Sequence, residues 1–508
     1  MSLMGIDIGT SSCKVLIISE NGDILAQTSE LYSLHTNTDG HVELNPFEVR
    51  EKVFSCIRRC NAFFTPEAVT AFSISSQGEA IIPVNSQFEP LTFAPVSADL
   101  RGLPYVGQLR ERFGDRYIRQ ITGQLLDPIH SIFKIMWWNE HERSIQDKCW
   151  KYCCFDAYIL LSLGMPPITD TSMASRTMLY DITKRDWSSE LLSFASVERS
   201  ALPEVVCSGT LVGTLPEKIS ESLGFSTPPD VVVGGHDQPC AAFGNGLVDS
   251  GVSYSIGTTE CISVIRKGAH ICNSAWDFPT YPHLFSGTTV TLIGSQTGTR
   301  IFRWLGTVLF DESSQEFDEN MELFYDLIRT VSKDLTTPVL FLPHLFGGSS
   351  LYEDPYAKAM IYGFSQDTGR RKFLKAVMEG ITFEQYLGYQ KFLGQISNDE
   401  INDSVIVATG GGARLQNFLS IKSDVFGKVF TTKQSHEAGC IGAAMLAGLG
   451  NGCFTTPHEA IELCVVNAQQ VYPDDTLKLY YQEKVKQYDI LYQALKTLHL
   501  QGESHATK

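Results

Sequence analysis

The sequence lacks the features that mark secreted and membrane proteins. No basic segment followed by a long apolar run opens the chain, so we expect no signal peptide. No apolar run approaches the roughly 20 residues that a membrane-spanning helix needs. We therefore expect a protein that acts in the cytoplasm and has no membrane partner.

The 13 cysteines lack the spacings of a metal site or a disulfide framework. No CxxC pair occurs, and neither the pair Cys56 and Cys60 nor the pair Cys153 and Cys154 recurs with histidines at zinc-site spacing. In a reducing compartment, most of these thiols are expected to be small, buried, apolar side chains.

Positive charge is scarce, because 40 lysines and arginines stand against 57 aspartates and glutamates. The formal net charge of −17 repels polyphosphate backbones, so nucleic acid is not an expected partner. A bound nucleotide would need its charge offset locally, by backbone N–H groups and a divalent cation.

Two common nucleotide-binding motifs are also absent. No G-x-x-x-x-G-K-[ST] occurs, so a P-loop is not supported. No strand leads into G-x-G-x-x-G with an acidic residue about 20 positions further on, so a Rossmann dinucleotide site is not supported either.

The length and an internal repeat indicate two domains. A chain of 508 residues exceeds what one hydrophobic core usually serves. The segments "GIDIGTSS" and "YSIGTTE" each end an apolar strand in Ile-Gly-Thr, one near the start of each half. We expect two related α/β domains over residues 1–246 and 247–450, with a helical extension and tail over residues 451–508.

Glycine-bearing turns follow four predicted strands, at Gly9-Thr10, Gly234-Gly235, Gly257-Thr258 and Gly410–Gly412. Glycines let backbone N–H groups approach phosphate oxygens without an intervening Cβ. One such turn is just as typical of a hairpin or a flexible loop. Four of them together indicate a nucleotide held between two domains.

The chain resembles the FGGY family of carbohydrate kinases over nearly its whole length. The resemblance is carried, in order, by "GIDIGTSSCKV", "TDTSMASRTMLYDITKRDW", "VVVGGHDQPCAAFGNG", "SIGTTE", "FLPHLFGG…DPYAKAMIYGF", "AVMEGITF" and "ATGGGARLQNFLSIKSDVFG". It implies two duplicated actin/hexokinase/Hsp70-like (ribonuclease H-like) α/β domains with a nucleotide cleft between them. It further implies a small sugar or polyol as substrate, ATP and Mg²⁺ as cofactors, and a homodimer as one expected assembly.

The resemblance also implies roles for individual residues. Asp237, in "GGHDQ", resembles the catalytic base, and Asp7 resembles the acidic residue that holds the Mg²⁺ shell. The implied nucleotide-binding residues are Gly9, Thr10 and Ser11 in the first phosphate turn, Gly257 and Thr258 in the second, and Gly410, Gly411 and Asn417 at the adenosine site. The alternatives are a helix N-cap for Asp237, a solvated turn residue for Asp7, and either a tuning or a structural role for His236.

A carboxylate at position 237 suits phosphoryl transfer. The sugar hydroxyl must lie in line with the γ-phosphorus, and a carboxylate can orient it and accept its proton. Such general-base help is typically worth about 10²–10⁴-fold in rate.

The predicted sugar pocket departs from both familiar branches of the family. Gln77-Gly78-Glu79 stands where xylulokinase-like members usually have Met-His-Gly and glycerol-kinase-like members have Gln-Arg-Glu. Ile129 stands where the glycerol-kinase-like branch usually has an aromatic residue. The loss of an arginine and an aromatic side chain predicts a larger pocket, and hence a substrate larger than glycerol.

Four polar residues are predicted to bind sugar hydroxyls: Gln77, Glu79, Asp99 and Gln238. Each could equally be a surface or supporting polar residue. Glu79 and Asp99 would repel an anion, so a neutral ketose or polyol, with xylulose as the best guess, is preferred over gluconate. Gluconate and glycerol kinases are the alternatives within the class, and a non-catalytic ATP-binding switch or sugar sensor is the alternative outside it.

Overall fold

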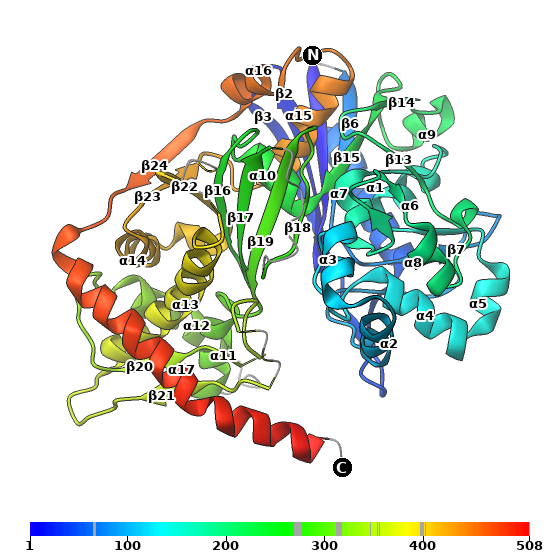
Figure 1. Cartoon of the computed structure of the whole chain (residues 1–508). Helices are drawn as coiled ribbons and strands as arrows, with labels where there is room; N and C mark the ends of the chain where they lie inside the picture. The colour runs from blue at the N-terminus through cyan, green and yellow to red at the C-terminus, as the bar shows by residue number, and fades with distance from the viewer. Residues whose placement is uncertain are drawn as a thin grey trace. The chain divides into compact units, whose positions relative to one another are not determined.

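The computed structural model describes residues 1–63, 68–268, 277–310, 317–345, 347–352, 354, 356–396, 401 and 403–506. The chain forms two compact units (Figure 1). Unit 1 comprises Met1–Asp249, Ile265–Thr291 and Glu437–Val466, and unit 2 comprises Ser250–Val264, Leu292–His436 and the chain from Asn467 onwards. These units interleave along the chain, so the domain limits at residues 246 and 450 stay predictions.

A six-stranded mixed sheet forms the centre of unit 1, in the order β14-β15-β6-β1-β2-β3. The strands are β1 (Ser2–Ile8), β2 (Ser12–Ser19), β3 (Ile24–Leu31), β6 (Val69–Ser76), β14 (Leu211–Thr214) and β15 (Asp230–His236). Strands β1, β2 and β3 pair antiparallel in sequence order, as a meander. Strands β1, β6 and β15 run parallel, so their carboxyl ends meet at one edge of the sheet.

Helices α10 (Asp237–Gly244) and α15 (Ala438–Gly450) pack closely within unit 1. A Cβ on Gly442 of α15 would lie 2.0 Å from the carbonyl oxygen of Cys240 in α10. A Cβ on Gly5 of β1 would likewise overlap the carbonyl of Cys440. The small residues of "EAGCIGAAMLAGLG" therefore allow α15 to contact both α10 and the sheet through backbone atoms.

Unit 1 also contains further helices and short strands. The helices are α1 (Pro46–Phe63), α2 (Leu103–Phe113), α3 (Asp115–Thr122), α4 (Ser131–His141), α5 (Arg143–Lys148), α6 (Phe155–Ser162), α7 (Thr171–Arg176), α8 (Ser189–Phe194), α9 (Glu217–Ser222) and α16 (Pro457–Cys464). The short strands are β4 (His35–Thr36), β5 (Val42–Leu44), β7 (Ile82–Val84), β8 (Ala94–Pro95), β9 (Lys151–Cys153), β10 (Ile168–Asp170), β11 (Tyr180–Asp181), β12 (Asp186–Trp187), β13 (Glu204–Val206) and β18 (Thr280–Pro282).

The second large sheet has the order β18-β19-β17-β16-β22-β23-β24. Its further strands are β16 (Gly251–Ile256), β17 (Glu260–Lys267), β19 (Thr288–Ser295), β22 (Val405–Thr409), β23 (Val429–Lys433) and β24 (Asn467–Val471). Strands β16 and β22 are parallel, so the glycine turns that follow them start from the same sheet edge. The strand, Gly-Thr turn and strand of β1 and β2 recur in β16 and β17, as the internal repeat predicted.

Unit 2 is completed by helices and a small sheet. The helices are α11 (Arg300–Leu309), α12 (Phe317–Arg329), α13 (Arg370–Leu393), α14 (Gln416–Phe426) and α17 (Lys478–Ala506), and the small sheet pairs β20 (Leu340–Leu342) with β21 (Met360–Tyr362). Helix α17 confirms the helical extension that was expected near the end of the chain.

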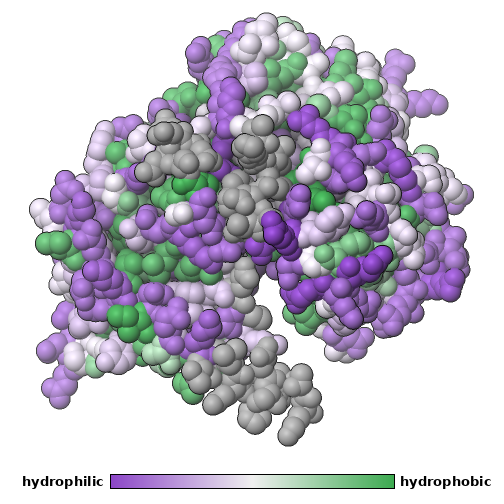
Figure 2. Space-filling view, in the orientation of Figure 1, coloured by the Kyte–Doolittle hydropathy of each residue, from purple (hydrophilic) through white to green (hydrophobic). Residues whose placement is uncertain are grey.

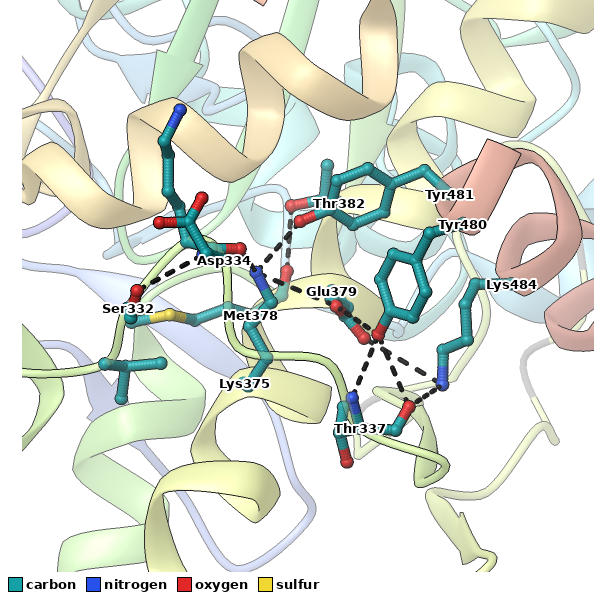
Figure 3. Close-up of polar contacts among 12 residues, drawn as sticks. Ser332, Asp334, Thr337, Lys375, Met378, Glu379, Thr382, Tyr480, Tyr481 and Lys484 are labelled. Carbon is teal, nitrogen blue, oxygen red and sulfur yellow. Dashed lines mark hydrogen bonds and ion pairs between the residues drawn. The ribbon is translucent and has the colours of Figure 1, made fainter. Parts of the chain in front are cut away.

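A buried polar cluster fixes α17 against α13 (Figure 3). Lys375 Nζ of α13 donates to Tyr481 Oη of α17 at 2.9 Å, and Tyr480 Oη donates to Glu379 Oε1 at 3.0 Å. The Glu379 carboxylate also lies 3.8 Å from Lys375 Nζ and 3.9 Å from Lys484 Nζ. Desolvation raises the pKa of Glu379 to about 7, although both lysines oppose this rise.

Hydrophilic residues cover much of the face drawn in Figure 2, with apolar residues in separate patches. Among the helices that the structure describes, none combines the length and the apolar character needed to cross a bilayer. Most cysteines in the described ranges are buried, as expected, while Cys207 is exposed.

Candidate active site

Asp237 is the first residue of α10 and directly follows the carboxyl end of β15. The residue in the N-cap position is His236, so the predicted alternative of Asp237 as the cap is wrong. The Asp237 side chain is 30% exposed. Desolvation raises the pKa of Asp237 to about 7, and the nearby carboxylates of Asp7 and Glu79 add to the rise.

His236 links Asp237 to a tyrosine of β18. Its Nε2 lies 3.2 Å from Asp237 Oδ1, and its Nδ1 lies 2.8 Å from Tyr281 Oη. Burial lowers the pKa of His236 well below its ordinary value, so the imidazole is neutral. A neutral imidazole has one N–H, so the tautomer decides whether Nδ1 accepts from or donates to Tyr281 Oη. Asp237 Oδ1 is buried and has no hydrogen-bond partner among the described residues, so the approach of Nε2 is a close contact without hydrogen-bond geometry.

Asp7 lies near the carboxyl end of β1 and is half-buried. Ser75 Oγ, on the neighbouring strand β6, donates to Asp7 Oδ1 at 2.6 Å. Gly439 of α15 covers the carboxylate, since a Cβ there would lie 2.8 Å from Asp7 Oδ1. Burial raises the pKa of Asp7, while the Ser75 hydrogen bond and the Lys14 charge oppose this rise. The alternative of a solvated turn residue is therefore wrong.

The first predicted phosphate turn is held from two sides. Gly9 N donates to Ser12 O at 3.0 Å, which closes the turn between β1 and β2. The Gly9 carbonyl accepts from Gln77 Nε2 at 3.0 Å and from Tyr32 Oη. Tyr32 Oη also lies within hydrogen-bonding distance of Ser12 O, at 2.9 Å. Gln77, predicted to bind sugar, therefore also supports the turn that contains Thr10 and Ser11.

The other predicted sugar ligands differ in their surroundings. The Asp99 carboxylate is fully buried and accepts from Arg101 Nε at 2.8 Å and from Val42 N at 2.7 Å, so both of its oxygens have protein partners. Gln238 is the second residue of α10, next to Asp237. The roles of all four residues as sugar ligands stay predictions.

Glu79 is buried and binds Arg176, the last residue of α7. Arg176 Nε donates to Glu79 Oε1 at 2.5 Å, and Arg176 Nη1 donates to Gln124 Oε1 at 2.7 Å. The Arg176 guanidinium also lies over the ring of Tyr281, 5.3 Å from its centroid.

The sequence predicted open space at Gly78, where glycerol-kinase-like members have an arginine. This prediction is wrong. A Cβ on Gly78 would lie 2.9 Å from Arg176 Cγ and 3.0 Å from His236 Cδ2. The volume beside Gly78 is therefore taken by an arginine from another segment. Sequence reasoning missed this, because Arg176 is 98 positions away. The one signal was a lone arginine among the small residues of "TSMASR", whereas nothing in the sequence pointed to Tyr281.

In unit 2 the second phosphate turn and the triple glycine lie side by side. A Cβ on Gly410 would lie 2.7 Å from Ile256 O, next to Gly257, whereas a Cβ on Gly411 would meet nothing within 4 Å. The loop before α11 supports the same turn, since Thr299 N and Oγ1 both donate to Gly257 O, at 2.8 and 2.9 Å. A Cβ on Gly298 of this loop would lie 2.5 Å from that carbonyl. Sequence reasoning missed this loop.

Asn417 makes two hydrogen bonds at the end of α12 in unit 2, one to the helix and one to the segment just after it. Its Nδ2 donates to Ile328 O at 2.7 Å and to Val331 O at 3.0 Å. These bonds anchor the first turn of α14, and the adenosine role of Asn417 stays a prediction.

The carboxylates of unit 1 fit a Mg²⁺ ion that is bound together with a nucleotide. They do not fit a metal ion that is bound by protein side chains alone. Among the described residues, no group of three or more His, Cys, Asp or Glu side chains could hold a metal ion. Mg²⁺ typically takes one or two carboxylates and completes its shell with water and substrate phosphates. Asp7 offers such a carboxylate, two residues before the glycine of the first phosphate turn.

Comparison with known proteins gives two consecutive family matches. Residues 2–244 match the N-terminal domain, and residues 252–450 the C-terminal domain, of the FGGY family of carbohydrate kinases. The xylulose kinase of Staphylococcus xylosus is 26% identical over 491 residues, which cover 96% of this chain and 99% of the relative. The gluconokinase of Bacillus subtilis (strain 168) is 25% identical over 465 residues, which cover 89% of this chain and 88% of the relative.

A solved structure supports the fold. The crystal structure of ligand-bound xylulose kinase from Lactobacillus acidophilus matches with a TM-score of 0.85 at 23% identity, over 97% of this chain and 98% of that one. At this identity the likeness concerns the fold, and it confirms the expected pair of α/β domains.

Proposed function

The chain belongs to the FGGY family of carbohydrate kinases, and from this premise we propose that it transfers the γ-phosphoryl group of ATP to a hydroxyl of a neutral sugar or polyol larger than glycerol. A xylulose-like ketose is the best candidate. The observation that carries the proposal is the half-buried Asp237, whose oxygen Oδ1 is buried without a hydrogen-bond partner among the described residues and whose pKa is raised to about 7 by desolvation and by the charges of Asp7 and Glu79.

Asp237 acts as the general base. Its carboxylate orients the attacking hydroxyl and accepts the proton as the bond to phosphorus forms. A pKa near 7 suits this role, because such a base is largely ionised at neutral pH and still basic enough to take the proton. Oδ1 of Asp237 is buried and has no hydrogen-bond partner among the described residues, so it is available to accept from the substrate hydroxyl.

ATP and Mg²⁺ are the cofactors of this proposal. Asp7 holds the metal shell, and the turns at Gly9–Ser11 and Gly257-Thr258 hold phosphates through backbone N–H groups. When bound, Mg²⁺ offsets charge on the phosphates. Gly410, Gly411 and Asn417 hold the adenosine; Gly411 suits this role because a Cβ there would meet no other atom.

A neutral substrate suits the charges around Asp237. Arg176 is paired with Glu79, so this pair adds no net positive charge that could hold a carboxylate. Asp237 and Asp7 add negative charge when ionised. Gluconate is the alternative that a similar gluconokinase suggests, and glycerol is the smaller alternative.

The test is sugar-dependent ADP release with Mg·ATP, measured for a panel of ketopentoses, ketohexoses, tetritols to hexitols, glycerol and aldonic acids. We expect one neutral sugar or polyol to give the highest kcat/KM, and mass spectrometry of the product then identifies the phosphorylated carbon. A best substrate among the aldonic acids contradicts the neutral substrate. ATP binding without ADP release from any member favours the switch or sensor.

A further inference from the structure

We propose that Arg176 is a positioning residue of the sugar site, which orients Glu79 towards the substrate and supports His236 against Asp237. This inference rests on the proposed kinase function and adds a residue that determines sugar affinity. The arginine comes from the end of α7, whereas Glu79 and Asp237 follow strands β6 and β15.

The contact between Arg176 and Glu79 is a buried, charge-assisted pair. Both side chains are less than a tenth exposed, and Arg176 binds the carboxylate through both Nε and Nη2. Its remaining terminal nitrogen, Nη1, donates to the buried Gln124. Nε and Nη2 both contact the same oxygen, Oε1, so the guanidinium fork holds one oxygen of the Glu79 carboxylate in place.

The backbone of Glu79 is held in a position that needs such support. Its φ of 62° lies in the left-handed region, which a non-glycine residue rarely adopts. Ser131 Oγ and Lys134 Nζ, both from α4, donate to the Glu79 carbonyl at 2.9 and 3.0 Å. The backbone and the side chain of one residue are therefore fixed from two different helices, α4 and α7. Strained residues held in this way are concentrated at ligand sites.

The absence of a side chain at position 78 lets Arg176 reach both carboxylate-bearing segments. The stem of Arg176 passes Gly78 so closely that a Cβ would lie 3.0 Å from Arg176 Cβ and 3.0 Å from His236 Cδ2. The guanidinium then lies over the Tyr281 ring, whose hydroxyl binds His236. A continuous set of contacts thus runs from Glu79 through Arg176, Tyr281 and His236 to Asp237.

Several titratable or charged groups face this guanidinium. They are Glu79 after β6, Asp127 and His130 before α4, His236 and Asp237 at the junction of β15 and α10, and Tyr281 of β18. Lys134 of α4 is near Glu79. The positive charge of Arg176 favours the ionised form of Asp237. Without this charge, the negative charges of the nearby carboxylates would be offset less. The pKa of Asp237 would then rise, and Asp237 would keep its proton to higher pH.

The test compares Arg176→Met and Arg176→Lys with the wild type, using the best sugar of the panel. For Arg176→Met we expect KM for the sugar to rise by about 10- to 100-fold, because a charge-assisted contact is lost. We expect KM for ATP to stay within about twofold and the acidic limb of the kcat/KM profile to shift to higher pH. Arg176→Lys keeps the charge but not the fork, so its acidic limb should return towards the wild-type position while KM for the sugar stays raised.

A second pair of variants covers the case in which Arg176→Met does not fold. Gly78→Ala places a Cβ against Arg176 and His236, whereas Gly107→Ala makes the same substitution on an exposed helical position of α2 with nothing within 4 Å. We expect only Gly78→Ala to raise KM for the sugar. An active wild type whose KM for the sugar and pH profile are unchanged by Arg176→Met, or by Gly78→Ala, overturns this inference. A wild type that releases no ADP with any sugar overturns the proposed function instead.

Discussion

Asp237 is the residue on which the proposed chemistry depends, and its pKa sets the pH range in which it can act. The base must be ionised, so kcat/KM should rise about tenfold per pH unit on the acidic side and level off above a pH of about 7. A kcat/KM profile from pH 5 to 9 at saturating Mg·ATP checks this. An acidic limb near pH 4 would contradict a desolvated base.

The same raised pKa has a consequence for stability. A group whose pKa is raised by folding stabilises the native state below its unfolded pKa, and this contribution is lost as the pH rises through 7. At pH 8, Asp237→Asn should therefore raise the free energy of unfolding by about 1 kcal/mol. Urea unfolding at pH 5 and pH 8 measures this, and a gain that is no larger at pH 8 than at pH 5 contradicts it.

Gly439 makes room for Asp7, and this predicts a strong effect of one methyl group. In Gly439→Ala, the Cβ would lie 2.9 Å from Asp7 Cγ, so the carboxylate must move. We expect kcat/KM for Mg·ATP to fall by about 100-fold, since misplacing a catalytic group by about 1 Å has that effect. The control is Gly369→Ala at the N-cap of α13, where a Cβ meets nothing within 4 Å. Equal activity of the two variants would count against Asp7 as the metal-holding residue.

At the residue scale, the sequence indicated residues at the ends of strands and missed residues that reach the site from distant parts of the chain. Asp7 and Asp237 were indicated by the resemblance of their segments to the FGGY family, and Gln77 by its place in a segment that departs from the family's usual residues. Arg176 and Tyr281 come close to them only after folding, and no local pattern encodes that proximity. For this reason the space at Gly78 was interpreted as open.

At the scale of elements, α17 is predicted to depend on its buried lysine. Lys484 Nζ donates to Val339 O at 2.7 Å and lies close to Glu379, so Lys484→Met leaves a buried carboxylate with one cation fewer. We expect the free energy of unfolding to fall by about 3 kcal/mol. Lys486→Met, at an exposed position of the same helix, should change it by less than about 0.5 kcal/mol. Similar losses in the two variants would show that the cluster of Figure 3 does not anchor α17.

A second prediction concerns Asn417 of α14. This residue makes structural hydrogen bonds and is also proposed to bind the adenosine. Asn417→Ala loses two hydrogen bonds at the end of α12, which should lower stability by about 1–2 kcal/mol. If Asn417 also contacts the adenosine, KM for ATP should rise by about tenfold while KM for the sugar is unchanged. Thermal unfolding and steady-state kinetics separate the two effects. A loss of stability with an unchanged KM for ATP would restrict Asn417 to anchoring α12.

Most elements could be predicted from apolar periodicity and from glycine turns. The opening meander, the strand before Asp237, the small-residue helix α15 and the long C-terminal helix all follow such patterns. The assembly of α15 with the first sheet could not be predicted, since the contact between Gly5 and Cys440 joins positions 435 residues apart.

At the scale of the whole molecule, the Gly-Thr turn that recurs after β1 and β16 indicated the duplicated fold. The assembly state and the location in the cytoplasm stay predictions. A homodimer is one assembly that the family resemblance implies, and light scattering of the purified protein tests it. In the proposed function, backbone N–H groups and Mg²⁺ offset the phosphate charge of ATP locally, which is how an acidic chain can bind a nucleotide.

The measurement that tests the central claim most directly is sugar-dependent ADP release by the wild type and by Asp237→Asn, together with the affinity of each protein for ATP. We predict that the variant binds ATP as the wild type does but releases ADP about 10²–10⁴-fold more slowly with the best sugar. An Asp237→Asn variant that keeps wild-type turnover would contradict the assignment of Asp237 as the base. A wild type that binds ATP but releases no ADP with any sugar would contradict the kinase itself.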